Sequence, residues 1–206
     1  AALGILRIII ECKIDLDVVA CVDFALEQFE HEFDRNNVRQ LALDFIFDRL
    51  KGYCLDKGYG PDEFDAVIAV LPPEPLDFMQ RLDAVKTFRQ MPEAESLASA
   101  NKRIRNILRK AEIQPTAAVD KLAQEEELAL LSAANQSAID IQPLLEQRNY
   151  QDTLARLAQL KNSVDAFFDH VMVMCDDPEL RSHRLNLLNM LSEQFLTCAD
   201  ISRLQP

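Results

Sequence analysis

Glycine is scarce in this chain of 206 residues: it occurs four times, at Gly4, Gly52, Gly58 and Gly60. These glycines form neither a GxGxxG nor a GxxxxGK[ST] pattern, which excludes phosphate-binding loops of those two types. Tryptophan is absent, and no stretch alternates between apolar and polar residues as a half-buried strand does. Leucine and alanine are abundant instead, so the sequence predicts an all-α fold of helices joined by short turns.

Residues suited to catalysis or metal binding are also few. The three histidines are far apart and form no HExxH pair: His31, His170 and His183. The five cysteines include no CxxC pair: Cys12, Cys21, Cys54, Cys175 and Cys198. We interpret them as buried, reduced thiols of a cytoplasmic protein. Because no GxSxG elbow or other nucleophile motif occurs, we expect no catalytic residue, no metal site and no cofactor in this chain.

Long apolar runs are missing too. The longest near the start, residues 1–10, is interrupted by Arg7 and is too short to span a bilayer. It lacks the charged start and the cleavage site of a signal peptide, so we expect no membrane contact. Because the chain has no initiator Met and opens inside an apolar periodic segment, we interpret it as part of a longer polypeptide.

Acidic residues outnumber basic ones, 34 to 22, which gives a formal net charge of −12. Residues 11–34 hold eight acids and one base, and residues 112–149 hold seven acids and two bases. Residues 81–110 reverse the balance, with eight bases and three acids. Salt screens distant charges over about 8 Å at physiological ionic strength, so a local basic helix can bind a polyanion even in an acidic protein.

Helical periodicity defines the expected elements. It predicts helices over residues 16–33, 38–55, 76–89, 150–160, 164–174 and 178–201, and one long helix or two over residues 116–147. Asp62 is the expected N-cap of a short helix that ends at Leu71. Pro92 is expected in the first turn of the next helix, which continues to Ala111.

The balance of charge predicts a boundary near Met91 and Pro92. Residues 1–91 are expected to form an acidic helical segment. Residues 92–206 are expected to form a basic helix, then an acidic hairpin that includes a solvated run at residues 125–127, and then a helical bundle.

The stretch from residue 99 to residue 111 is the most informative. At 100° per residue its apolar side chains form one stripe about 100° wide: Ile104, Ile107, Leu108 and Ala111. The opposite face gathers Lys102, Arg105, Asn106 and Arg109, with Arg103 and Lys110 at its flank. Arginine grips phosphate bidentately and stacks on unpaired bases, and asparagine reads a base edge. This face suits RNA; by itself it would also suit an acidic protein partner, or be a plain solvated surface.

Several motifs in order along the chain resemble one family. Residues 94–108, AESLASANKRIRNIL, resemble the AxxLAxANKRxxNIL signature of the β subunit of bacterial glycyl-tRNA synthetases. Residues 164–174, VDAFFDHVMVM, resemble its VDAFFDxVMVM block, and residues 184–188 and 199–202 match its RLxLL and ADIS elements. Upstream matches are residues 65–67 and 75–78, Arg81 and Phe88. The resemblance covers nearly the whole chain.

The resemblance implies a function. The synthetase of this family is an α/β heterotetramer whose α subunit activates glycine, with ATP and Mg²⁺ used by the holoenzyme and not by this chain. The β subunit ends in an all-helical anticodon-binding domain of the DALR type, and this chain resembles that C-terminal part. The implied partners are glycine tRNA and, through the full-length β subunit, the α subunit. The residues expected to contact the anticodon arm are Lys102, Arg103, Arg105, Asn106 and Arg109.

Two residues depart from the family pattern. Arg105 stands where the family often has a small residue, which strengthens the basic face, and Arg203 replaces a commonly apolar position. The apolar residues of the 164–174 block are expected in the core. The alternative function is a helical subunit-interaction module that uses its acidic face and makes no direct contact with RNA.

Overall fold

The computed structural model describes residues 2–111 and 119–204, and in these residues it contains α-helices, one 3₁₀-helix and no strand. The helices are α1 (Ala2–Glu11), α2 (Val18–Glu27), α3 (Arg35–Asp56), α4 (Pro61–Ile68), α5 (Pro75–Phe88), α6 (Ala94–Ala111), α7 (Glu125–Glu146), α8 (Tyr150–Ala158), α9 (Lys161–His170), α10 (Pro178–Leu196) and the 3₁₀-helix η1 (Ile201–Arg203). The prediction of an all-α fold is confirmed for this part of the chain.

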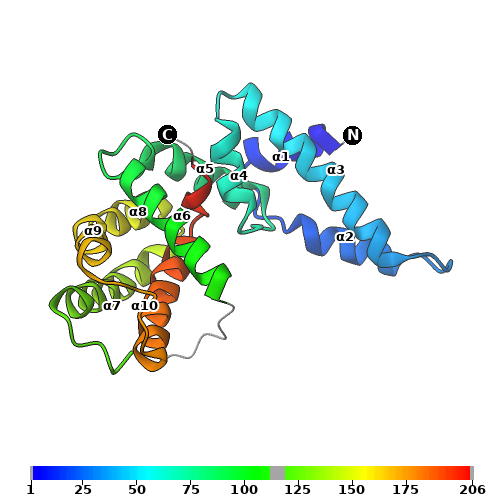
Figure 1. Ribbon diagram of the computed structural model, residues 1–206. Coiled ribbons are helices and arrows are strands. Elements are labelled where there is room, and N and C mark those ends of the chain that lie inside the picture. The colour runs from blue at the N-terminus through cyan, green and yellow to red at the C-terminus, as the bar shows by residue number, and fades with distance from the viewer. Residues whose placement is uncertain (1, 112–118, 205–206) are drawn as a thin grey trace.

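The helices form an arm and a bundle (Figure 1). The arm consists of α1, α2 and the long α3, and the bundle consists of α6 to α10. Between them lie α4 and α5, of which α5 packs on α8 of the bundle. The last turn, η1, contacts both α4 and α6. The end of the described chain therefore lies where the arm side meets the bundle.

Arg81, on α5, ties the two sides together. Its guanidinium donates to the carbonyl oxygens of Thr197 (2.6 Å) and Cys198 (2.9 Å) and to the hydroxyl of Tyr150 (2.9 Å). It also pairs with Asp77 at 2.7 Å, and the Tyr150 hydroxyl donates to the same carboxylate. Through this network α5 packs with the bundle although it precedes residue 92. The division into residues 1–91 and 92–206 stays a prediction.

The start of α4 differs from the prediction. Gly60, and not Asp62, is the N-cap, and Pro61 occupies the first helical position. Proline is favoured there because its missing N–H is one of those that a helix start leaves unpaired. The Glu63 carboxylate accepts the Gly60 N–H at 2.8 Å, which satisfies a further backbone donor of the first turn.

Other helix ends also moved. α6 begins at Ala94, so Pro92 precedes it instead of lying in its first turn, and α2 ends at Glu27 instead of continuing to residue 33. Asp34 then accepts the N–H of Asn37 at 3.0 Å and caps α3. α10 ends at Leu196, short of residue 201. The part of the long predicted helix at residues 116–118 lies outside the described residues.

The end of α9 changes which residues of the 164–174 block are buried. α9 stops at His170, and Val171 is extended, with φ −108° and ψ 120°. From there side chains alternate: Val171 and Val173 enter the core, whereas Met172 and Met174 are exposed. The core expectation is therefore right for the valines and wrong for the two methionines.

Glu127 corrects the expectation that residues 125–127 are solvated. It is fully buried, accepts the N–H groups of Ala123 and Gln124 at 2.9 Å each, and forms an ion pair with the buried Arg184. Burial pushes the pKa of Glu127 up, but the two backbone N–H groups and Arg184 outweigh it, so the pKa lies below its ordinary value. The pair joins the start of α7 to α10.

Replacing Glu127 should therefore destabilise the fold strongly. We expect Glu127→Ala to lower the free energy of unfolding by about 3–5 kcal/mol, because it leaves Arg184 buried without a counter-charge. Urea unfolding followed by circular dichroism measures this. The exposed neighbour gives the control: Glu125→Ala should change stability by no more than about 0.5 kcal/mol. Equal effects of the two substitutions would contradict this account of the pair.

The cysteines match their prediction only in part. Cys54 and Cys198 are buried, but Cys12 and Cys21 are exposed and Cys175 is half-buried, and all five thiols are free. Burial, with a smaller contribution from the Asp83 charge, raises the pKa of Cys54 to about 12. Burial likewise raises the pKa of Cys198 to about 11.

These differences predict selective alkylation. At pH 8 iodoacetamide should modify Cys12 and Cys21 in the native chain, because the thiolate is the nucleophile and both side chains are accessible. Cys54 and Cys198 should react only after denaturation, as peptide mass spectrometry can show. Labelling of either buried thiol at the rate of Cys12 would mean that the core opens far more readily than this packing implies.

Candidate nucleic-acid interface

One face of α6 is packed and the other is open. Leu97, Ala98 and Ile104 are buried, and Ile107 and Leu108 are half-buried against the same core. The apolar stripe predicted for this helix is thus confirmed. It fixes the rotation of α6, so the side chains of the opposite face are turned away from the core.

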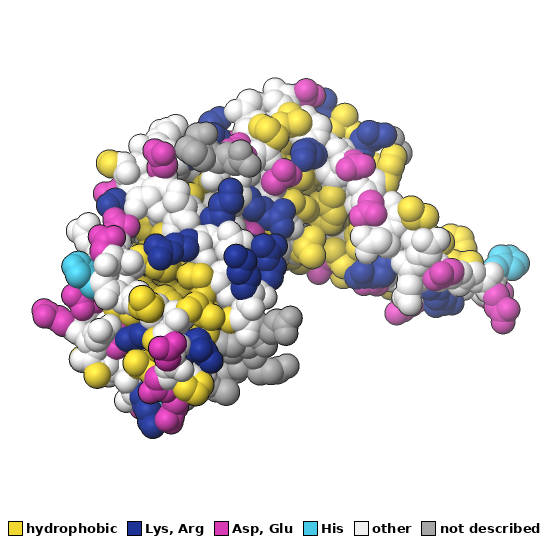
Figure 2. All heavy atoms as spheres, in the orientation of Figure 1, with side chains coloured by type: hydrophobic (Ala, Val, Ile, Leu, Met, Phe, Trp, Pro, Cys, Tyr) yellow, Lys and Arg dark blue, Asp and Glu magenta, His cyan; other side chains and the backbone are white. Residues whose placement is uncertain are grey.

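Four of the five predicted contact residues line one hollow of about 420 Å³. They are Lys102, Arg105, Asn106 and Arg109, and the opposite wall consists of Asp200, Ser202 and Arg203 from the last turn of the chain. We call these seven residues the basic hollow. Figure 2 shows Lys and Arg side chains gathered in the middle of the molecule, where α6 and η1 lie in Figure 1.

Asp200 organises the wall of the basic hollow. Only 1% of this residue is exposed, and its Oδ2 atom pairs with both Arg105 and Arg203, the latter at 3.0 Å. Its Oδ1 atom accepts the Ser202 hydroxyl at 2.6 Å. The two departures from the family pattern, Arg105 and Arg203, therefore meet on one carboxylate.

The remaining polar groups of the hollow are less constrained. Arg109 donates to the Asn106 side-chain oxygen at 3.1 Å, and both residues are exposed. Burial, and secondly the charge of Arg203, lower the pKa of Arg105 from its ordinary value. Arginine starts from so high a pKa that it keeps its charge at neutral pH. The hollow thus presents four cations around one buried anion.

Arg103 does not lie in the basic hollow. Its guanidinium carbon is 4.2 Å from the centroid of the Phe168 ring on α9, a cation–π contact. The structure brings together the other four residues predicted from the sequence and leaves Arg103 at the side. Its contact with RNA stays a prediction.

A second hollow adjoins the first, because the two share Lys102, Ser202 and Arg203. Its other lining residues are Pro61, Asp62 and Asp65, from the start of α4. Asp62 pairs with Arg89 at 2.9 Å and Asp65 pairs with Lys51 at 2.8 Å. The acidic side chains of α4 therefore border the basic hollow without contacting its arginines through any of these pairs.

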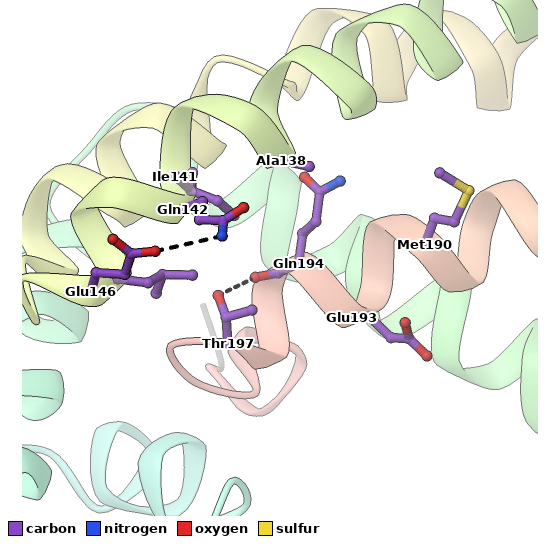
Figure 3. Close-up of a pocket in the computed structure, with 9 residues that line it drawn as sticks. Ala138, Ile141, Gln142, Glu146, Met190, Glu193, Gln194 and Thr197 are labelled. Carbon is purple, nitrogen blue, oxygen red and sulfur yellow. Dashed lines mark hydrogen bonds between the residues drawn. The ribbon is translucent and has the colours of Figure 1, made fainter.

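A groove of about 450 Å³ between α7 and α10 has a different character (Figure 3). It is lined by Ala138, Ile141, Gln142, Leu145, Glu146, Met190, Glu193, Gln194 and Thr197. No Lys or Arg is among these residues, and its two charged side chains, Glu146 and Glu193, are both acidic. A polyanion would be repelled there, so the groove is not the candidate interface.

Among the described residues, no three His, Cys, Asp or Glu side chains are grouped so that they could hold a metal ion. No described helix is long and apolar enough to cross a membrane. The largest concentration of functional groups that remains is the basic hollow. Its guanidinium forks and amide suit a phosphate backbone with accessible bases.

Comparison with known proteins places this site within a family. The sequence profile of the DALR anticodon binding domain matches residues 97–203, which run from α6 to η1 and contain the whole basic hollow. This part of the molecule is therefore an anticodon-binding domain of the DALR class. The profile of the glycyl-tRNA synthetase beta subunit matches residues 1–69.

Similar whole proteins agree. The chain is 46% identical over 206 residues to the glycine–tRNA ligase beta subunit of Pseudomonas aeruginosa, and the alignment covers 99% of this chain. It is 44% identical to that of Aliivibrio fischeri and 42% identical to that of Photobacterium profundum, in each case over 100% of the chain. The chain belongs to the glycyl-tRNA synthetase β-subunit family. It spans 30% of the length of these relatives.

Some functional residues were missed by the sequence analysis. Asp200 and Ser202 were noticed only as part of a family motif, and Arg203 only as a departure from the family pattern. They follow α6 by about a hundred residues, and no periodicity links positions so far apart. The one local signal is two charged residues, Asp200 and Arg203, in an apolar stretch of sequence.

Proposed function

We propose that this chain binds the anticodon arm of glycine tRNA and that the basic hollow is the contact surface. One observation carries the proposal: four cations and an amide converge in one hollow of a protein whose formal net charge is −12. The surrounding acidic surface repels RNA, so contact concentrates where positive charge does. The hollow also lies within the segment that resembles DALR anticodon-binding domains.

The side chains divide the work by their chemistry. Lys102, Arg105 and Arg109 bind backbone phosphates, and arginine does so through two parallel N–H donors. The Asn106 amide offers both donors and an acceptor to the edge of an unpaired base. Binding at this surface holds the tRNA for the assembled enzyme, a cytoplasmic α/β heterotetramer that attaches glycine with ATP and Mg²⁺ bound outside this chain.

Removing single charges from the basic hollow tests this proposal. Arg109→Ala and Lys102→Ala should each weaken binding of glycine tRNA, because each phosphate contact releases counterions. The slope of log affinity against log salt should fall by about 0.7–0.9 for each lost contact. Fluorescence anisotropy of the labelled tRNA across a salt series measures both quantities, with an anticodon-swapped tRNA alongside.

The matched control is Arg7→Ala, which removes an exposed cation from α1, outside the basic hollow. It should leave affinity and slope almost unchanged. If all three variants bind like the unmodified chain, the basic hollow is not the RNA surface.

A second function is favoured by the arm. Six large apolar side chains on it are between 52% and 67% exposed: Ile5, Ile8, Phe24, Phe29, Leu41 and Phe45. Figure 2 shows hydrophobic side chains along the arm, interspersed with acidic ones. Exposed apolar surface rimmed by charge is typical of protein–protein contacts. The arm therefore suits another part of the assembled enzyme, including the α subunit, with an apolar centre and a basic rim.

Charged substitutions on the arm should separate assembly from RNA binding. Phe24→Asp combined with Phe45→Asp should prevent association with the α subunit, because the contact would bury two unpaired carboxylates. Binding of glycine tRNA by the chain should persist. Sedimentation velocity of the mixed subunits measures assembly. Ile139→Asp is the control, since Ile139 is 67% exposed but lies on α7 in the bundle; disruption by this variant alone would contradict the proposal.

A further inference from the structure

Asp200 is an acid at the centre of a surface proposed to bind an acid. Its carboxylate accepts Arg105 from α6, and Arg203 and Ser202 from η1. Its backbone N–H donates to the carbonyl oxygen of Ala66 on α4 at 2.9 Å, so its main chain is anchored as well. A buried carboxylate held so firmly reduces the positive charge of the hollow, and this loss calls for a compensating benefit.

The arginines supply the reason. The side chains of Arg105 and Arg203 are 42% and 48% exposed, so packing alone does not fix them. The two cations repel each other, and the lowered pKa of Arg105, caused by burial and then by Arg203, is consistent with their proximity. The shared carboxylate offsets this repulsion and holds both guanidinium groups on one side of the hollow.

The ion pairs leave donors available for a ligand. Each guanidinium carries five N–H donors in a rigid fork. Asp200 pairs with Nη1 of Arg105 and with Nε of Arg203, so the other nitrogen atoms of both forks remain available. Two forks held next to each other match the oxygen atoms of a phosphodiester group.

We propose that Asp200 is a positioning residue for RNA binding: it holds Arg105 and Arg203 as a clamp for one backbone phosphate. The inference rests on the proposed function of the basic hollow and adds a role for a residue whose own charge opposes an anion. The gain comes from pre-organisation, because a side chain ordered before binding loses less conformational entropy on binding.

Charge and positioning predict opposite signs for Asp200→Asn. If charge alone matters, removing the carboxylate makes the hollow more positive and tightens RNA binding. If Asp200 positions the arginines, the same substitution frees both forks and weakens binding. Asp65→Asn removes an equal charge from the adjoining hollow, but the ion pair it breaks is with Lys51 and not with an arginine of the clamp.

The experiment measures the affinity of the 206-residue chain for glycine tRNA, with thermal melting as a check on folding. We expect Asp200→Asn to weaken binding roughly tenfold, as ordering two long side chains on binding implies. Asp65→Asn should bind as tightly as the unmodified chain or more tightly. Asp200→Asn binding as tightly as the unmodified chain, or more tightly, overturns the inference.

A second variant covers the case in which Asp200→Asn fails to fold. Arg105→Lys keeps the charge at an exposed position but loses the fork. It should weaken binding severalfold while the salt slope stays the same, because the number of cations is unchanged. Unchanged affinity of Arg105→Lys would show that charge alone matters and would overturn the clamp.

The outcomes separate this inference from the proposed function. If Arg109→Ala and Lys102→Ala weaken binding but Asp200→Asn strengthens it, the basic hollow is the RNA surface and only the positioning role is wrong. If neither Arg109→Ala nor Lys102→Ala has an effect, the proposed function is wrong and the clamp falls with it.

Discussion

The carbonyl oxygens of Thr197 and Cys198 accept hydrogen bonds from Arg81, and the position of the last turn depends on this interaction. A helix leaves its final carbonyls without partners, and buried carbonyls need one. Because the donor comes from α5, the end of α10 is fastened to a helix far back in the sequence. Residues 200–203 follow at once, so the same contact places the wall of the basic hollow opposite α6.

An acidic chain and a proposed RNA surface are compatible because charge acts over a short range. The acids of the arm and those of residues 120–146 lie on other elements than the cations of α6 and η1. At physiological salt most of their field is screened before it reaches the hollow. The distribution of charge then matters more than its sum: the acidic surface discourages RNA elsewhere and confines binding to one orientation.

The sequence predicted what periodicity and local chemistry determine. The apolar stripe of α6 implied which side chains face solvent, and Lys102, Arg105, Asn106 and Arg109 do share a hollow. Tertiary contacts decided the rest. The ring of Phe168, remote in sequence, draws Arg103 aside. Glu127 looked like one of three solvated acids, and only the fold reveals that the buried Arg184 is its partner.

The two halves of the basic hollow are far apart in the order in which the chain is made. A ribosome synthesises α6, with its lysine and arginines, well before it reaches Asp200 and Arg203. A nascent chain that has not yet completed η1 therefore has the cations of α6 without the wall that faces them. Such a chain attracts polyanions only diffusely, so selective capture of a nucleic acid arises late in translation, once the polypeptide is nearly finished through residue 203.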